Sequence, residues 1–592
     1  MSDNHQNINI FNPNILGLIS FFIVISIFAT PFQYAKKNEG RYLLSVIKKT
    51  DDNLFQNDLV VESLSKFKSI YYDLIGYLLG LQNNTDINTT LRNTIFSIFI
   101  VNKICFFLLL IFLTRALNQS IVFFIIFAIF AMHSKSIING SGGLFMPMAR
   151  HSEIAILTGI ASFISLLYNK NYLFWILLSI TVLTHSLIGI HLFLIMLAYI
   201  TINYNNHIKD SWSIIIFIIT IFYYSLHYAP PSMTIDEAKL FLSVKAASNH
   251  ISFLNQGILN WVSCIGIILL ALLLNIVYKQ HDQFKIFNIL IISGSIISFA
   301  LSLIFYFTNF HYLALIQPIR IFLWVSFFCF ISIINSTTLL FYKNNRLYFI
   351  LLSILCLIIL NSLWFIPLVY IVISYLISKS LTIPGNNNFS ERLLNRAFIL
   401  FGVIITIAIM VGDSSGRLLF LNDIKPLFII IPFLLLIITG KRISYNHTLS
   451  ILALVLTMSF VLKTIERHDY FKKRKNEGWD SIRLWFPKNT LKTSKVIVAG
   501  GAGNFRTLAL RSCYGESESA LSWVDPNLQS KISKNFALVN KGYVNDSWDI
   551  NYKMMLSKRW GAKYILIRGD YHPDTISPIY SMDDYHIFQY NE

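Results

Sequence analysis

The chain has 592 residues, of which 55% are hydrophobic and only 13% are charged, and its mean hydropathy is +0.58. Soluble domains carry roughly a quarter charged residues, so the composition excludes an ordinary soluble protein and indicates a polytopic membrane protein. The net charge of +18 lies mostly in short loops between apolar runs, where Lys and Arg set membrane orientation. The charge therefore does not indicate nucleic-acid binding.

Apolar runs of roughly the length that crosses a bilayer follow one another between residues 14 and 463. The runs 172–203 and 347–378 are each interrupted by polar residues, so each is either two short spans or one long span. The sequence therefore predicts an α-helical membrane domain over residues 1–463, with about 13–15 spans. The candidate spans are 14–32, 95–114, 119–137, 153–168, 172–185, 187–203, 212–228, 258–277, 286–307, 320–341, 347–361, 363–378, 396–411, 417–439 and 448–463.

The short loops carry an asymmetric distribution of positive charge. With the N-terminus in the cytoplasm, nearly all the Lys and Arg of the short connectors lie on the cytoplasmic side, as the positive-inside rule requires. The long polar segments then gather on the opposite face, so we expect the chemistry there. These segments are the outer loop 33–94, three further loops (133–153, 228–257 and 308–320) and the C-terminal residues 464–592.

The outer loop 33–94 concentrates acidic residues, with Asp51, Asp52 and Asp58 among them. Residues 59–81 show apolar residues at helical spacing, which predicts an amphipathic helix on the membrane surface or a short extra span. Asp58 directly precedes this helix. A carboxylate there can act as a general base, hold a divalent ion, or cap the helix.

Five further polar residues fall where predicted spans begin or end on the outer side. Arg150, His151 and Glu153 lie at the start of one span, where Arg suits bidentate phosphate binding and also suits an interfacial anchor. His185 interrupts an apolar segment, and its spacing of six residues from His191 does not fit helical metal ligands. Arg320, at another span start, is a second phosphate candidate.

Residues 464–592 have the composition of a soluble domain. Strands expected at 495–499, 505–511, 520–524, 564–567 and 585–590 alternate with helices expected at 479–486 and 551–560, which predicts a small α/β domain. The glycine-rich turn 500–503 follows the first strand. It departs from the dinucleotide-binding pattern, so a tight turn is the favoured interpretation over a phosphate cradle.

The architecture resembles the GT-C superfamily of polytopic membrane glycosyltransferases, in particular functionally unassigned bacterial members. The residues that carry the resemblance are Asn57-Asp58 with the following helix, Arg150 to Glu153, Thr184-His185 and, in the soluble domain, 485–490, 503–506, 508–512 and 561–564. The resemblance implies a protein of the bacterial inner (cytoplasmic) membrane whose N-terminus is cytoplasmic and whose C-terminal α/β domain is extracytoplasmic.

The resemblance also implies transfer, with inversion, of a sugar from a polyprenyl-phosphate-linked donor to an acceptor on the outer face. Asp58 would be the base, Arg150 and Arg320 would hold the donor phosphate, and Asp52, His151, Glu153 and His185 would line the site. Asp51 and Asp52 compete with Asp58, and the chain lacks an acidic pair next to the first span. The need for a divalent cation, Mg²⁺ or Mn²⁺, therefore stays open.

Two other functions fit an outward-facing membrane protein of this kind. A lipid-linked saccharide transporter or flippase would place ionisable residues and broken helices near the bilayer midplane, which His185 partly satisfies. A polysaccharide polymerase or ligase would act outside on a growing polymer. Both stay open as alternatives to the glycosyltransferase.

Overall fold

The computed structural model of the chain describes the apolar N-terminal part and the C-terminal domain. The described residues are 13–30, 32–34, 38–51, 53–65, 69–80, 87–133, 150–202, 212–227, 258–277, 282–308, 316–342, 477–499, 505–515, 526–541, 543–544, 547–571 and 576–590. The spans expected between 347 and 463, the boundary at 463/464, Asp52 and the glycine turn 500–503 lie outside them.

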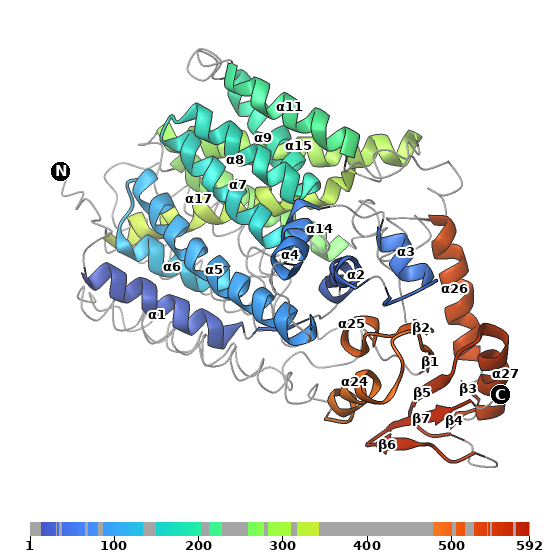
Figure 1. Cartoon of the computed structure of the whole chain (residues 1–592). Coiled ribbons are helices and arrows are strands. Elements are labelled where there is room, and N and C mark those ends of the chain that lie inside the picture. Colours follow the sequence, from blue (N-terminus) through green and yellow to red (C-terminus); the bar gives the residue numbers. More distant parts are fainter. Residues whose placement is uncertain are drawn as a thin grey trace, which may run out of the picture.

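The described N-terminal part is a bundle of apolar helices that coincide with the expected spans (Figure 1). Three segments are long and apolar enough to cross a membrane: Ile87–Ala116, Lys285–Phe305 and Pro318–Leu339. The other apolar helices are shorter. The bundle helices are α1 (Pro13–Ala29), α5 (Ile87–Ala116), α6 (Ile121–His133), α7 (His151–Leu167), α8 (Asn171–Thr184), α9 (Ser186–Ile202), α11 (Trp212–His227), α14 (Ile258–Val277), α15 (Asp282–Thr308) and α17 (Phe322–Tyr342).

Helix α17 lies at the centre of this bundle and packs on α6, α14 and α15. Its Trp324 is fully buried, donates a 3.0 Å hydrogen bond to the carbonyl of Ile188, and lies directly against Gly159 of α7. Polar side chains also join the helices, since Asn275 donates to Asn288 and to Ser332. Interhelical hydrogen bonds of this kind satisfy polar groups that lipid cannot.

The outer loop forms three short helices, α2 (Asn38–Thr50), α3 (Leu59–Ser65) and α4 (Ile70–Gly80). The single helix expected over 59–81 is therefore two helices. Helix α4 buries Tyr72 and Ile75 on the loop core and exposes Leu74 and Tyr77 on its other face. At 11 residues it is too short to cross a bilayer, and its exposed apolar face suits the membrane surface.

The C-terminal domain is a three-layer α/β/α sandwich around a five-stranded sheet of order β2-β1-β5-β7-β6. Strand β1 pairs in parallel with β2 and β5, whereas β7 runs antiparallel to β5 and β6. The elements are α24 (Glu477–Asn489), β1 (Lys495–Ala499), α25 (Phe505–Ala509), β2 (Ser512–Tyr514), α26 (Pro526–Lys541), β3 (Tyr543–Val544), β4 (Ser547–Trp548), α27 (Ile550–Trp560), β5 (Tyr564–Arg568), β6 (Tyr580–Met582) and β7 (Tyr585–Gln589).

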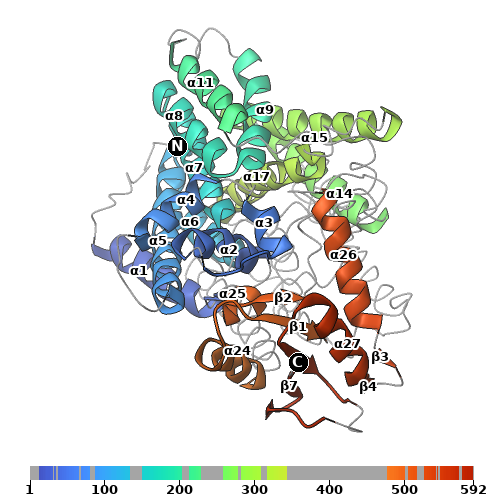
Figure 2. The ribbon, with the colours of Figure 1, turned by 45° about the vertical axis from the view of Figure 1, so that its right-hand side comes forward.

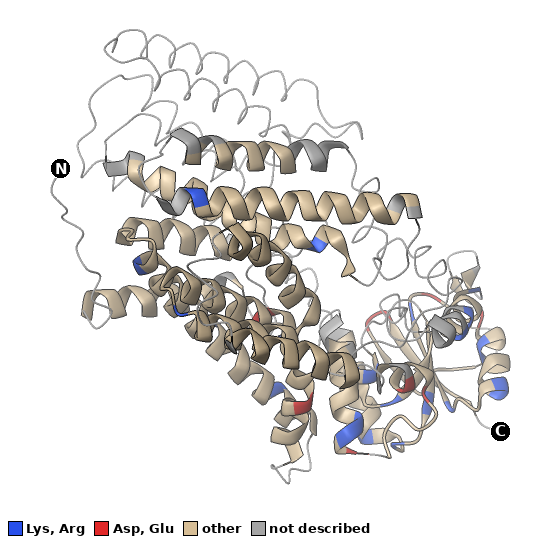
Figure 3. Cartoon of the chain, turned by 90° about the horizontal axis from the view of Figure 1, so that it is seen from above, with Lys and Arg blue, Asp and Glu red and all other residues tan. Residues whose placement is uncertain are grey.

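Alternating residues of β1 supply both faces of this sheet, as the strand period of two requires. Val496 and Val498 face a core shared with α24 and α25, whereas Ile497 and Ala499 face a core shared with α26 and α27. The expected strands 495–499, 564–567 and 585–590 are confirmed as β1, β5 and β7, and the expected helices as α24 and α27. Charged residues gather on this domain, whereas the helical bundle is almost free of them (Figure 3).

The strand expected at 505–511 is wrong, because residues 505–509 form helix α25. A helical turn puts Phe505 and Ala509 on one face, in the sheet core, and turns Arg506 and Thr507 toward the outer loop. Five apolar and polar residues are too few for periodicity to separate helix from strand. The strand expected at 520–524 lies outside the described residues.

The outer loop and the C-terminal domain share one hydrophobic core, so they form a continuous unit. Ile532 of α26 is buried in the cluster that contains Leu43, Phe55 and Phe99, and Leu508 packs against it. In two views of the ribbon, α25 lies beside α2, and α26 rises toward α3 (Figures 1 and 2).

Candidate functional site

The first of two polar centres surrounds Asp58, which the sequence proposes as catalytic base. Its side chain is only 2% exposed and forms an ion pair with the 4% exposed Arg506. The guanidinium Nε donates to both carboxylate oxygens, at 3.1 and 2.9 Å. The backbone N–H groups of Val60 and Val61 donate to Oδ1, so the carboxylate also caps helix α3.

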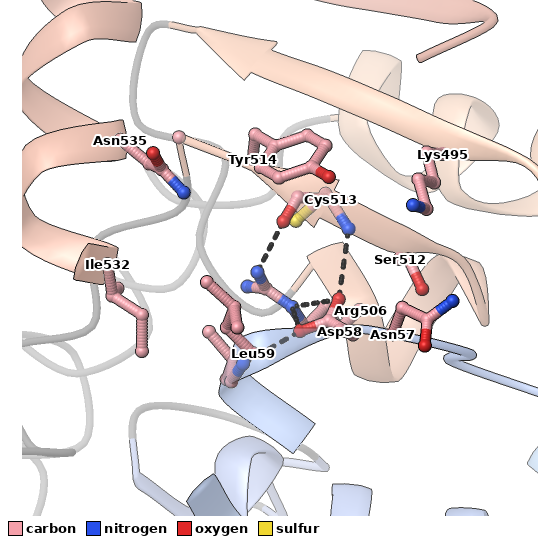
Figure 4. Close-up of a pocket in the computed structure, with 12 residues that line it drawn as sticks. Asn57, Asp58, Leu59, Lys495, Arg506, Ser512, Cys513, Tyr514, Ile532 and Asn535 are labelled. Carbon is pink, nitrogen blue, oxygen red and sulfur yellow. Dashed lines mark hydrogen bonds and ion pairs between the residues drawn. The ribbon is translucent and has the colours of Figure 1, made fainter. Parts of the chain in front are cut away.

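The ion pair also closes the free edge of the sheet, because β2 is an edge strand. The Cys513 N–H donates to Asp58 Oδ2 at 3.2 Å, and the Cys513 carbonyl accepts a hydrogen bond from Arg506 Nη2 (Figure 4). Asp58 and Arg506 thereby occupy both backbone polar groups of one edge-strand residue, Cys513, as a neighbouring strand would. The pair therefore joins the outer loop to the C-terminal domain.

Further contacts reinforce this junction. Lys492 forms a 2.8 Å ion pair with Asp51, and this hydrogen bond lowers the pKa of the Asp51 carboxyl. Thr507 donates to the carbonyl of Gly40, and Asn88 donates to that of Leu508 at 3.3 Å. Every contact joins the outer loop, or the start of α5, to the C-terminal domain.

A pocket opens beside the ion pair (Figure 4). Of the predicted site residues, only Asp58 lines it, together with Asn57, Leu59, Val60, Lys495, Arg506, Ser512, Cys513, Tyr514, Gly515, Ile532 and Asn535. The hydrogen bonds of the Asp58 carboxylate stay within this region, and among the described residues none reaches Arg150, His151 or His185. The role of Asp58 as base stays a prediction, while its observed contacts are those of a structural link.

The second polar centre lies where α7 begins and α8 ends, and it brings four predicted residues together. The rings of His151 and His185 stack at 4.7 Å with an angle of 12° between their planes. Arg150 and Arg320 act electrostatically on His151 and on each other. Residues from three separate chain segments therefore meet in one cluster, which we call the Arg/His cluster: Arg150, His151, His185 and Arg320.

The outer loop covers this cluster with aromatic side chains. The Tyr72 hydroxyl lies 3.1 Å from Nδ1 of His151, and the Tyr42 ring packs edge-on against His151 at 5.2 Å. The Ser69 hydroxyl donates to the carbonyl of Thr184, which ties the start of α4 to the end of α8. The backbone at His185 is extended, with φ −151° and ψ 97°, and this residue separates α8 from α9. The break expected at residues 184–186 is thus confirmed.

Glu153, predicted to line the substrate site, has partners in helix α5. Its Oε1 lies 3.9 Å from Nζ of Lys103, and Asn102 donates to Oε2 at 3.5 Å. Both charged side chains are buried, and the Lys103 ammonium lies 4.7 Å from the ring centre of Phe99. The pair occurs one helical turn from Arg150 and holds the start of α7 against α5.

Sequence reasoning missed Lys103, Tyr72 and Arg506 as partners of the predicted residues. Lys103 was detectable, because an ionisable residue inside a candidate span is a functional candidate by default. Tyr72 and Arg506 carry no such local signal. Among the described residues, no group of three His, Cys, Asp or Glu side chains is arranged to hold a metal ion, so the question of a divalent cation stays open.

No protein-family model, curated protein or solved structure matches this chain. A functional assignment therefore depends on the two polar centres alone.

Proposed function

We propose that the protein is a membrane glycosyltransferase that takes its sugar from a polyprenyl-phosphate-linked donor at the extracytoplasmic face. The Arg/His cluster carries this proposal. The guanidinium groups of Arg150 and Arg320 lie close enough to repel each other, so their charges favour a bound anion. A phosphate between them would compensate the repulsion and form charge-assisted hydrogen bonds.

The position of the cluster suits a lipid-linked donor. It lies beneath the outer-loop helices α2 and α4, at the ends of apolar helices α7 and α8. A prenyl chain would lie along the bundle, while the phosphate and sugar would face the outer loop. The aromatic rings of Tyr42 and Tyr72 on His151 give the site a partly apolar wall, which sugar-binding sites use for stacking.

The residue roles in this proposal separate binding from chemistry. Arg150 and Arg320 would hold the phosphate, His151 and His185 would contact the bound donor, and the Lys103–Glu153 pair positions the first turn of α7. The base in this proposal is Asp58, with Asp51 and Asp52 as the competing candidates that the sequence predicts. For Asp58 to act as base, its carboxylate would have to leave Arg506.

The test uses the full chain in lipid nanodiscs and mass spectrometry of the lipids that stay bound. We expect a polyprenyl-phosphate-linked sugar to co-purify and to be consumed when acceptor extracts are added. Arg150→Gln and Arg320→Gln should each weaken donor binding between about tenfold and about 100-fold, since each removes charged hydrogen bonds. Arg115→Gln is the matched control, because Arg115 is exposed in the last turn of α5. Unchanged binding in both cluster variants would refute the proposal.

A lipid-linked saccharide transporter is the second candidate, and the buried Lys103–Glu153 pair in a candidate span favours it. The two functions differ in the product. A transporter in proteoliposomes moves the lipid-linked sugar between leaflets and leaves it chemically intact, whereas a transferase releases polyprenyl phosphate.

A further inference from the structure

A short turn before helix α17 presents Arg320 to the Arg/His cluster, and its backbone is held at three successive carbonyls. The Ile316 carbonyl lies 2.6 Å from Nε2 of His191, and the Gln317 carbonyl accepts from the Arg320 N–H at 2.9 Å. The Pro318 carbonyl accepts from the Ser298 hydroxyl at 2.7 Å. Helices α9 and α15 therefore both fix this turn.

Gln317 adopts a left-handed conformation, with φ 50° and ψ 66°. This region is uncommon for residues other than glycine and costs free energy, so the surrounding structure must enforce it. The three carbonyl contacts supply that enforcement. The strained residue directly precedes the 3₁₀ turn Pro318–Ile321 that carries Arg320.

The Gln317 side chain is also buried, since the residue is only 4% exposed. Its Oε1 is inaccessible to solvent and accepts no hydrogen bond from the part of the chain that the structure describes. A buried acceptor without a donor is costly, and such atoms in folded proteins call for an explanation. A bound ligand that donates a hydrogen bond supplies one.

We infer that Gln317 is a specificity-determining residue that accepts a hydrogen bond from a sugar hydroxyl next to the donor phosphate. The inference rests on the proposed function and adds to it the selection between a glycosylated lipid phosphate and the bare one. Arg320, three residues along the same turn, binds the phosphate. The Gln317 side chain recognises the sugar that is attached to that phosphate. A bare prenyl phosphate satisfies the arginine but offers Gln317 no hydroxyl.

The test measures the affinity of the full chain, in detergent, for three ligands: prenyl phosphate, prenyl phosphate carrying one hexose, and phosphatidylglycerol. We expect the hexose-bearing lipid to bind most tightly. Gln317→Met should weaken its binding between about fivefold and about 150-fold, the loss of a hydrogen bond to a buried acceptor. The affinity for bare prenyl phosphate should stay within about twofold, which also shows that the variant is folded.

Gln119→Met is the matched control, because Gln119 lies in the turn between α5 and α6, outside the cluster, and should leave all three affinities unchanged. If Gln317→Met does not fold, Gln317→Glu replaces it. Glutamate keeps an acceptor oxygen, so we expect the preference for the hexose to persist while both phosphates bind more weakly.

Three outcomes would overturn the inference: an equal loss for both prenyl lipids in Gln317→Met, no loss for either, or tighter, Gln317-dependent binding of phosphatidylglycerol. A preference that depends on Gln317 without any sugar transfer would refute the transferase and leave this inference standing. Sugar transfer without a preference that depends on Gln317 would refute this inference and leave the proposed transferase standing.

Discussion

Replacement of Asp58 by Asn tests whether this residue links two parts of the molecule. The carboxylate accepts hydrogen bonds from Arg506 and from the Cys513 N–H in a site where both charged side chains are almost completely buried. Removing one partner of a buried ion pair typically costs about 3 to 5 kcal/mol, because the other charge is left uncompensated. Lys492, the partner of Asp51, is exposed to solvent. Removing the Asp51 charge should therefore cost only about 1 kcal/mol or less.

Hydrogen–deuterium exchange of the full chain reports this loss locally, because the Cys513 amide hydrogen is itself bound by Asp58. At about 1.4 kcal/mol per factor of ten, Asp58→Asn should accelerate exchange in the 512–514 segment between about 100-fold and about 4,000-fold. Asp51→Asn, the matched control, should accelerate it about fivefold or less.

A double-mutant cycle with Arg506→Met completes this test. If the two side chains act as a pair, Asp58→Asn with Arg506→Met should cost little more than either change alone, with a coupling of about 2 kcal/mol or more. A coupling below about 0.5 kcal/mol would refute the idea that Asp58 and Arg506 join the outer loop to the C-terminal domain as a pair. Lost sugar transfer with unchanged exchange in Asp58→Asn would instead support the base role.

Three further predictions concern stability. Burial lowers the pKa of Lys553 to about 8 from 10.5. Between these pH values the folded chain therefore binds fewer protons than the unfolded chain. The free energy of unfolding should rise by about 3 kcal/mol from pH 8 to pH 10.5 for this reason. Urea unfolding followed by tryptophan fluorescence would show this rise, and Lys553→Met should flatten it. Gly159→Ala should cost about 1 to 3 kcal/mol of stability and lower the thermal midpoint, because the added methyl group would lie 2.5 Å from Trp324. Gly17→Ala is the control, since no atom lies within 4 Å of the methyl group added there. Arg511→Met should cost about 2 kcal/mol, since Arg511 donates to carbonyls at the end of α24, and faster exchange confined to that helix would show it.

The parts of the fold that sequence predicts well are those fixed by local patterning. Apolar runs predicted the bundle helices, and the β-branched run 495–499 predicted β1. The polar His185 indicated a break, which the structure places between α8 and α9. The Arg/His cluster was foreseeable residue by residue, because Arg and His at the ends of apolar helices are unusual.

What sequence did not predict depends on contacts between distant segments. Asp58 and Arg506 are 448 positions apart, and nothing near either residue identifies the other as its partner. The short helix α25 was predicted as a strand because five residues are too few to show a helical period, and its Thr507 contacts Gly40, which is 467 positions away. The left-handed Gln317 likewise depends on His191 and Ser298, which belong to other helices.

The closure of the sheet edge by Asp58 has a consequence for biogenesis. The ribosome synthesises the outer loop long before Arg506. During most of synthesis the Asp58 carboxylate therefore lacks its ion-pair partner and must stay hydrated. The loop can reach its final burial only once the C-terminal segment has been made and has packed against it. Burial of Asp58 is therefore completed by the C-terminal domain, and a chain interrupted before residue 506 would keep a hydrated carboxylate where the folded protein has a buried ion pair.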